Sequence, residues 1–296
     1  MASEKKKKKG LGKIEKIILI IIVIIGLCGL AYKPFLEKFF IPHAHDKISQ
    51  EAKKTSSKQY AKNLDNINTQ LDLQNWSSKA NKRFQYNDKP KNTTPTMPGQ
   101  KLNLNDLRNI AKNQMIIKDN DKYNDSLPDL TYDYSKVKPA SELDLSTLNP
   151  NYDKRLLTGH ISMPAINTNL PILEGVSNEN LYAGAGTLKP YQQMGKGNYA
   201  LASHFMPDGV SNFSKIGQLQ KGNMILLSNG KNIYRYKTIS VRNMPINSSS
   251  VVNDVKGKKL VTLVTCTDIY GSRRTVVQGE FVNKQSINSK LGKYFK

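Results

Sequence analysis

The chain has 296 residues, which is enough for one substantial domain with additional segments or for two small domains. Its formal net charge is +22, and a surface of this kind attracts polyanions. Nucleic acid is the usual partner of so basic a chain, but the N-terminus indicates export and argues against nucleic acid. Wall polymers and anionic lipid headgroups are then the expected anions, and a general contribution of the charge to solubility is the alternative.

The N-terminus has the pattern of a membrane anchor. The basic block Lys5–Lys9 precedes the apolar run Ile17–Tyr32, which contains no charged residue. A membrane span needs about 20 apolar residues, with a lower limit near 17, and snorkelling lysines extend this short run at its ends. The positive-inside rule places residues 1–16 in the cytoplasm, 17–33 in the cell membrane and the rest of the chain outside. A cleaved signal peptide is the alternative, with Gly29-Leu30-Ala31 as its cleavage site.

Residues 34–129 are predicted to form an extracellular polar stalk. From His43 onward this segment is rich in Lys, Asn, Gln and Ser, and such a composition does not bury enough apolar surface to fold alone. The run 92–98 is typical of a linker. One amphipathic helix is indicated by the spacing of Leu107, Ile110, Ala111, Gln114 and Ile117. We therefore expect a spacer that contains one or two helices.

From residue 130 the pattern changes to short apolar, β-branched runs bounded by Gly, Pro or Asn. Strands at this spacing indicate an all-β barrel or sandwich, and the turn Ser228-Asn229-Gly230 predicts a hairpin between the runs on either side of it. Residues 130–296 therefore form the predicted folded domain. The strands that we expect in it are His160–Met163, Leu170–Leu173, Tyr199–Ala202, Met224–Leu227, Tyr234–Val241, Leu260–Thr265 and Thr275–Val282.

Cys266 is the residue that first points to chemistry. It ends the predicted strand Leu260–Thr265, and it cannot pair with Cys28, the only other cysteine, because Cys28 lies in the apolar run. An unpaired thiol on an exported domain suggests intermolecular pairing or a reactive site. To attack a carbonyl at neutral pH, this thiol needs a lowered pKa or an adjacent base.

His204 is the candidate base among four histidines. It follows the run Tyr199–Ala202 and so lies at the mouth of a strand, where site residues are usually found. His160 fits an ordinary barrel position, and the other two, His43 and His45, lie beside the anchor.

Arg273 and Arg274 are the candidates for stabilising an oxyanion. They open the last predicted strand, and a hairpin places its start beside the end of the strand that carries Cys266. Because side chains alternate along a strand, only one of the two arginines points at the thiol. A solvated basic turn is the other interpretation of this pair.

The order His204, Cys266, Arg274, with Thr-Leu-Val-Thr before the cysteine, resembles the sortases, cysteine transpeptidases of Gram-positive cell surfaces. The resemblance covers about half of the chain, and it implies a closed eight-stranded sortase-type β-barrel with short helices. The blocks that carry it are Leu170-Pro171-Ile172, 181–188, 197–204, 262–266 and 274–280. The last of these blocks favours Arg274 over Arg273.

The resemblance also implies an activity. Cys266 attacks the Thr–Gly bond of a Leu-Pro-x-Thr-Gly sorting signal on a surface protein and forms a thioacyl-enzyme. His204 protonates the leaving amine and then deprotonates the incoming one, while Arg274 binds the substrate backbone or the oxyanion. An amine of a peptidoglycan precursor, lipid II, resolves the intermediate. On this interpretation, deleting 43–129 leaves peptide cleavage in solution intact.

The resemblance places substrate-binding residues around the strand ends. Val251 or Val252, in the loop before the cysteine strand, is expected to line the pocket for the Leu and Pro of the signal, and a place in the barrel core is the alternative for both. No cofactor and no metal are expected. Calcium stimulation is not supported, because Asp254 is the only acidic residue between Val241 and Leu260. The full set of expected substrate-binding residues is Ala202, Ser203, Val251, Val252, Leu263 and Thr265.

Within the family, the N-terminal anchor resembles class A, the housekeeping type, and there is no Asp-Pro-aromatic lid motif before the barrel. A pilus-polymerising class C enzyme is one alternative. A membrane-tethered, non-catalytic wall-binding module with an inert Cys266 is another. L,D-transpeptidases and papain-like peptidases fit less well: the first place His and Cys almost adjacent, whereas here they are 62 positions apart (266 − 204), and the second place Cys before His.

Overall fold

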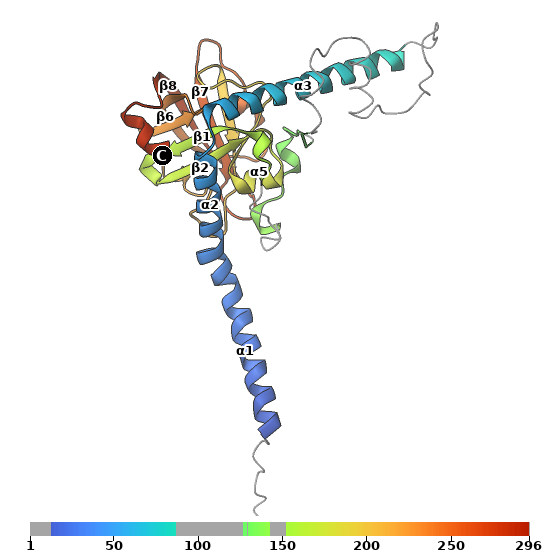
Figure 1. Cartoon of the computed structure of the whole chain (residues 1–296), viewed down its shortest axis with the longest axis vertical. Coiled ribbons are helices and arrows are strands. Elements are labelled where there is room, and N and C mark those ends of the chain that lie inside the picture. The colour runs from blue at the N-terminus through green and yellow to red at the C-terminus, as the bar shows by residue number, and fades with distance from the viewer. Residues whose placement is uncertain (1–12, 87–126, 129, 143–151, 296) are drawn as a thin grey trace, which may run out of the picture.

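The computed structural model describes residues 13–86, 127–128, 130–142 and 152–295. Long helices lie at the N-terminus and a β-barrel at the C-terminus (Figure 1). The predicted linker at 92–98 and the predicted helix around 107–117 lie outside the described residues. The helices are α1 (Lys13–Phe35), a π-helical segment (Leu36–Phe40), α2 (Ile41–Lys53), α3 (Ser57–Tyr86) and α5 (Asn178–Ala183).

Eight strands close into a barrel in the order β1-β2-β3-β4-β7-β8-β6-β5. The β2–β3 and β4–β7 pairs are parallel and the others antiparallel. The predicted closed eight-stranded barrel is therefore confirmed, including the hairpin at Ser228-Asn229-Gly230. The strands are β1 (Leu157–Met163), β2 (Thr168–Leu173), β3 (Ala185–Thr187), β4 (Asn198–Ala202), β5 (Met224–Ser228), β6 (Asn232–Met244), β7 (Leu260–Cys266) and β8 (Arg274–Ser286).

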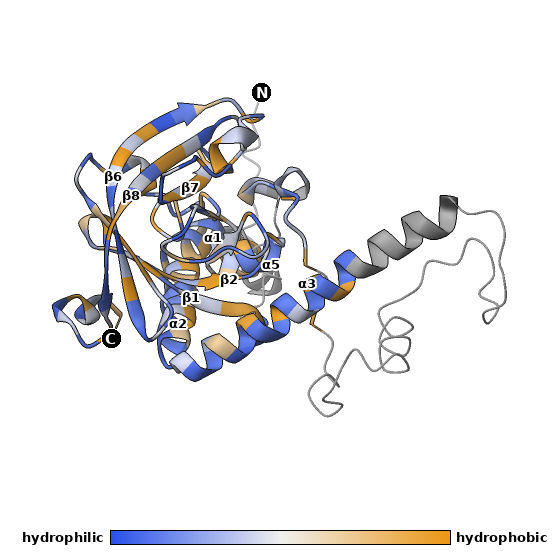
Figure 2. Ribbon diagram, turned by 90° about the horizontal axis from the view of Figure 1, so that it is seen from above, coloured by the Kyte–Doolittle hydropathy of each residue, from blue (hydrophilic) through white to orange (hydrophobic). Residues whose placement is uncertain are grey.

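The barrel is filled by apolar side chains from almost every strand. Ile161, Ile172, Leu201 and Leu263 are among the fully buried members of this core, and Figure 2 shows hydrophobic residues along the strands, while α3 is mostly hydrophilic. All seven residues of β7 are buried, because one face meets the core and the other is covered by neighbouring segments. The strand that ends in Cys266 is thus held rigidly on both faces.

The segment expected to be a free polar stalk begins instead with helices that pack on the barrel. Side chains from α2 and α3 form a buried cluster with Leu156, Leu157 and Leu173. The Asn63 amide also donates to the carbonyls of Lys154 and Leu157, both at 2.8 Å. The polar overall composition of this segment masks a narrow apolar stripe along the two helices. The stripe consists of Ile48, Ala52, Tyr60, Ile67 and Leu71. The domain boundaries drawn from the sequence stay predictions.

Because α2 and α3 pack on the barrel, we expect a chain that lacks them to be less stable, and not unaffected as a removable spacer would imply. A fragment that begins at residue 127 lacks α2 and α3, so it exposes Leu156, Leu157 and Leu173, each worth about 1.5–3 kcal/mol of burial. We expect its thermal midpoint to fall by roughly 10 °C or more relative to a fragment that begins at residue 36. Thermal denaturation followed by circular dichroism measures this, and equal midpoints for the two fragments would restore the spacer interpretation.

α1 covers the predicted anchor at 17–33. Within the part of the chain that the structure describes, no helix meets both the length and the apolarity that crossing a membrane requires. The anchor therefore stays a prediction.

Candidate active site

The site is built around Cys266, the last residue of β7. Its side chain is only 6% exposed, and the register of the β7–β8 hairpin pairs it directly with Arg274. Arg274 Nη1 donates to Cys266 Sγ over 3.3 Å and to the Gly271 carbonyl over 3.1 Å. The structure thus holds a guanidinium against the thiol sulfur.

Arg273, one residue earlier, turns away from the thiol. It is exposed, and its Nη2 donates to the Asn243 carbonyl over 3.3 Å. This is the arrangement that strand alternation predicts for two adjacent arginines. Of the two, Arg274 is the one that lies at the thiol.

His204 lies at the same end of the barrel because β4 and β7 run parallel. Ala202 pairs with Val264, so two residues further along each strand are His204 and Cys266. The Ser203 amide donates to the Val264 carbonyl over 3.2 Å, and Thr265 Oγ1 donates to the Ser203 carbonyl over 2.8 Å. These bonds carry the register past the end of β4 and bring the histidine to the cysteine end of the barrel.

The histidine and the thiol are both neutral at rest. Burial, with a further contribution from His45, lowers the pKa of His204 to about 4, against an opposing hydrogen bond to the backbone of Asn178. Burial raises the pKa of the Cys266 thiol above its usual range, although Arg274 acts in the opposite direction. Burial of both groups thus favours a free imidazole and a protonated thiol over a thiolate–imidazolium ion pair.

His45, on α2, is a residue whose place the sequence did not reveal. Its ring lies 4.8 Å from that of Tyr182, centroid to centroid. It is 6% exposed, and neither ring nitrogen has a hydrogen-bond partner among the described residues. Burial lowers its pKa to about 4. Because His45 also contributes to the lowered pKa of His204, the first turns of α2 lie next to His204.

Residues 130–142 cross the site as a covering segment, which we call the strap. Its Tyr134 hydroxyl lies close enough to the Cys266 thiol to act on the thiol's pKa, which it lowers, and the Arg274 guanidinium lies 5.2 Å from the centroid of the Tyr134 ring. At one end of the strap the Val176 amide donates to the Thr131 carbonyl over 2.8 Å, and at the other the Ser141 amide donates to the Ile269 carbonyl over 3.1 Å. Because the Asp-Pro-aromatic motif is absent, the sequence indicated no cover here, but the strap buries the thiol.

Removing the Tyr134 side chain is expected to uncover Cys266. In Tyr134→Ala the thiol gains solvent, and the burial that raises its pKa is relieved, so alkylation by iodoacetamide should be several-fold faster than in the parent. Tyr134→Phe keeps the cover and loses only the hydroxyl that stabilises the thiolate, so its thiol should react no faster than the parent. Intact-mass kinetics measure both variants. If Tyr134→Ala reacted at the parental rate, the strap would not be what shields the thiol.

Glu174 is a buried carboxyl beneath the strap. It is 4% exposed, and Tyr132 of the strap donates to its Oε1 over 2.7 Å. Burial raises the pKa of Glu174 to about 7, although hydrogen bonds from Tyr132 and Thr187 oppose the shift. The hydrogen bond from Tyr132 to Glu174 thus links the strap to the barrel through a carboxyl whose pKa is about 7.

Glu174 gives stability a defined pH dependence. An unfolded glutamate ionises near pH 4.5 whereas the folded one stays protonated until about pH 7, so the folded state binds more protons and stability falls as pH rises between those values. Glu174→Gln keeps an acceptor for Tyr132 and should remove up to about 3 kcal/mol of this loss. Thermal midpoints of both proteins from about pH 4.5 to above pH 7 check this; parallel pH profiles would mean that Glu174 ionises normally.

The candidate substrate-binding residues separate into two groups. Val251 and Val252 lie in a 3₁₀ turn, Ser249–Val252, and are partly exposed rather than part of the core. The Val251 carbonyl accepts from Asn198 Nδ2 over 2.9 Å, which ties the loop to the start of β4. Both valines stay candidates for contact with a substrate.

Leu263 requires a correction, because the structure places it in the barrel core, fully buried. It lies on the opposite face of β7 from Cys266 and so cannot line a groove in front of the thiol. Thr265 shares that inner face, and the Ser203 hydroxyl is fully buried and donates to the carbonyls of Leu181 and Gly184. Ala202 packs beside the strap with Leu181 and Val176, which is compatible with a place next to the site.

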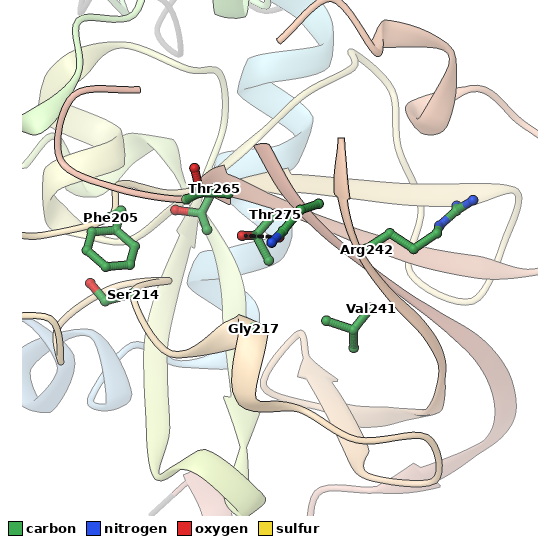
Figure 3. A pocket seen from close by; sticks show the side chains of 9 residues that line it. Phe205, Ser214, Gly217, Val241, Arg242, Thr265 and Thr275 are labelled. Atoms are coloured by element: carbon green, nitrogen blue, oxygen red, sulfur yellow. Dashed lines mark hydrogen bonds between the residues drawn. The ribbon is translucent and has the colours of Figure 1, made fainter. Parts of the chain in front are cut away.

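A pocket of about 270 Å³ lies behind the site, on the other face of β7 (Figure 3). Thr265 and Thr267, on either side of Cys266, line it, as do Thr275, which follows Arg274, and Phe205, which follows His204. Thr275 Oγ1 hydrogen-bonds Asn243 Oδ1 over 3.0 Å across its floor. This pocket therefore backs the strand ends and is not the approach to the thiol.

A metal site is not apparent in the described part of the chain. The described residues contain no group of three histidine, cysteine or acidic side chains placed to hold an ion. Asp254 instead pairs with Lys189 over 2.7 Å and accepts from the Asn198 amide over 2.9 Å.

Comparison with known proteins identifies the family. The family model for the sortase domain matches residues 161–282. The chain is 34% identical over 169 residues to sortase A of Listeria monocytogenes, covering 56% of this chain and 76% of that protein, and 39% identical over 152 residues to sortase A of Bacillus anthracis, covering 50% and 72%. The crystal structure of the Listeria enzyme aligns with a TM-score of 0.46 over 47% of this chain and 97% of that one. The chain belongs to the sortase family of cell-wall transpeptidases.

Proposed function

We propose that this chain is a membrane-anchored cysteine transpeptidase that cleaves a Leu-Pro-x-Thr-Gly sorting signal between Thr and Gly and joins surface proteins to a peptidoglycan precursor. The observation that carries the proposal is the 3.3 Å contact between Arg274 Nη1 and Cys266 Sγ, at the barrel end that also holds His204. A nucleophile, a base and a cationic donor for an oxyanion are the groups that acyl transfer requires.

In the proposed reaction the Cys266 thiol gives its proton to His204 as Sγ attacks the threonine carbonyl. Arg274 stabilises the oxyanion that forms. The C–N bond then breaks, the glycine amine leaves with the proton from His204, and a thioester remains on Cys266. An incoming amine attacks this thioester and loses a proton through His204, which restores the thiol as the new amide forms. The neutral resting pair fits this sequence, because the proton moves only when substrate is bound.

The proposed anchor is α1. Its residues from Ile21 to Tyr32 are uncharged and exposed, with Leu30 77% exposed, and a lipid environment accounts for a helix of this kind. The catalytic domain then lies outside the cell, as the basic N-terminus predicts.

The housekeeping class A assignment stays part of the proposal. The strap over Cys266 is the one observation that favours the class C alternative, because pilus-building members carry a cover before the barrel. The two differ in the acceptor: a class A enzyme resolves the thioester with a peptidoglycan-precursor amine, and a class C enzyme with a lysine of another pilin subunit.

The test uses the full chain in detergent with a quenched fluorescent Leu-Pro-x-Thr-Gly peptide and triglycine as acceptor. We expect cleavage, a triglycine-linked product and, without acceptor, an acyl adduct on Cys266 detected by mass spectrometry. A peptide with the Leu-Pro order reversed is the matched control and should be inert. A thiol that alkylates only after unfolding, together with no cleavage, would support the non-catalytic wall-binding alternative instead.

A further inference from the structure

The N-terminal helices form one continuous rod. Phe35, Phe40 and Ile41 all have right-handed helical backbone angles, so α1 passes through the π-helical segment Leu36–Phe40 into α2 without a break. Pro42, which lacks an N–H, follows this segment, and a π-helical turn accommodates the missing hydrogen bond. Figure 1 shows α1 continuing from α2 away from the barrel.

The two halves of the rod have different surroundings. Between Ile21 and Phe40 nearly all large apolar side chains are exposed, Phe39 by 71%, whereas Ile41, the next residue, is fully buried against the barrel. Tyr32, a residue type that is enriched where a helix leaves a bilayer, lies before the change, and Phe35, Phe39 and Phe40 lead up to it. The charged residues Lys33, Glu37 and Lys38 follow the proposed span 17–33 and fit the headgroup region, so the junction near residue 40 is where the outer surface of the membrane would lie.

The barrel meets this junction with its active-site end. Ile41 packs with Tyr182 and with Met206, two residues after His204, and His45 lies close enough to His204 to lower its pKa. The opposite end of the barrel, at the β5–β6 turn, lies beyond the end of the rod, where Gly230 abuts Ser57 and Tyr60 of α3. The rod thus runs along the barrel from the catalytic end to the far end.

We propose that the rod holds the catalytic end of the barrel directly against the lipid surface, so that His204 and Cys266 face the bilayer. The inference rests on the proposed anchor. His45 is five residues beyond Phe40, which is about 8 Å along a helix. Two loops at this end expose apolar side chains, Val210 by 53% and Tyr270 by 74%, and these are the side chains that we expect to meet the interfacial region.

This orientation specifies where the substrates react. A sorting signal whose C-terminal side is still held in the membrane, and an amine carried on a lipid, both reach the thiol at the bilayer surface. The partner of this face is therefore a lipid bilayer together with a lipid-linked acceptor.

The test measures the distance of two labelled sites from the lipid. In a full chain with Cys28→Ser and Cys266→Ala, a fluorophore is attached at Val210→Cys or at Lys231→Cys, an exposed position in the β5–β6 turn. The protein is reconstituted in vesicles of phosphatidylcholine and phosphatidylglycerol that contain a lipid with a nitroxide headgroup. We expect the label at 210 to lose most of its fluorescence and the label at 231 to lose little. Equal quenching in vesicle-bound protein overturns the orientation alone, whereas failure to bind vesicles overturns the anchor and the orientation together.

A second measurement tests the rigidity of the rod. Inserting Gly-Ser-Gly-Ser after Phe35 should abolish the difference in quenching between the two labels, whereas inserting Ala-Ala-Ala-Ala, which extends the helix by about 6 Å, should preserve much of it. In the Cys266 parent, neither insertion should change cleavage of the soluble peptide with triglycine. If the Gly-Ser insertion left the quenching unchanged, the rod would not be what orients the barrel.

Discussion

Replacing Cys266 with alanine is expected to abolish both cleavage and acyl-adduct formation, because the proposed mechanism uses its thiol and the other cysteine, Cys28, lies in α1. The loss should reach the background rate, several orders of magnitude below the parent, as is usual when a covalent nucleophile is removed. The quenched-peptide assay and intact-mass spectrometry measure the two effects separately. The substitution removes one buried sulfur next to Arg274, so the fold should persist.

The matched control is Cys28→Ser, which changes the other cysteine, an exposed one in α1. It should cleave the soluble peptide at the parental rate. Circular dichroism melting distinguishes a dead enzyme from an unfolded one. Residual cleavage in Cys266→Ala above that of a heat-inactivated sample would show that the nucleophile lies elsewhere.

The second large effect is expected at Arg274. Arg274→Ala removes the guanidinium that contacts Cys266 Sγ and should lower kcat/KM by about 100- to 1,000-fold, the usual effect of losing one oxyanion donor. Arg273→Ala removes an equal charge one residue away, from a side chain that faces Asn243, and should change kcat/KM by no more than a few-fold. Both variants lose one positive charge, so any difference in kcat/KM between them reports the position of the arginine and not the change in net charge.

Steady-state kinetics with the peptide substrate give the two values. If kcat/KM fell equally in the two variants, contact between Arg274 and Cys266 would not be what makes an arginine important for the reaction. Arg274→Lys adds a further comparison, because a lysine keeps the charge but not the guanidinium geometry.

The barrel was predictable because its signals are local. Turn residues at Ser228-Asn229-Gly230 indicated the β5–β6 hairpin. Alternation showed that only one of Arg273 and Arg274 faces the thiol, and the resemblance of residues 274–280 to a family block favoured Arg274. β3 was not predicted as a strand, because Ala185–Thr187 is too short to show a period. Its place between β2 and β4 comes from tertiary pairing, which no local pattern records.

The parts that the sequence did not reveal depend on contacts between distant segments. The segment that carries the apolar stripe from Ile48 to Leu71 is polar on average, and the stripe is recognisable as a packing face only when the barrel is seen against it. Tyr134 lies 132 residues from Cys266 in the chain (266 − 134), so neither residue predicts the other. His45 was set aside for its closeness to the anchor, and that same closeness brings it to His204. Leu263 was misplaced because a family block does not state which face of the strand each residue occupies.

The parallel pairing of β4 with β7 also has a consequence for how the protein matures. Cys266 and Arg274 are joined by a short hairpin, whose closure needs little loop entropy, but His204 reaches them only when two strands about sixty residues apart align. Non-local parallel pairing of this kind is slow to form. We therefore expect the thiol to spend the early stages of folding without its base, so that a newly made chain is catalytically inactive until the barrel has closed.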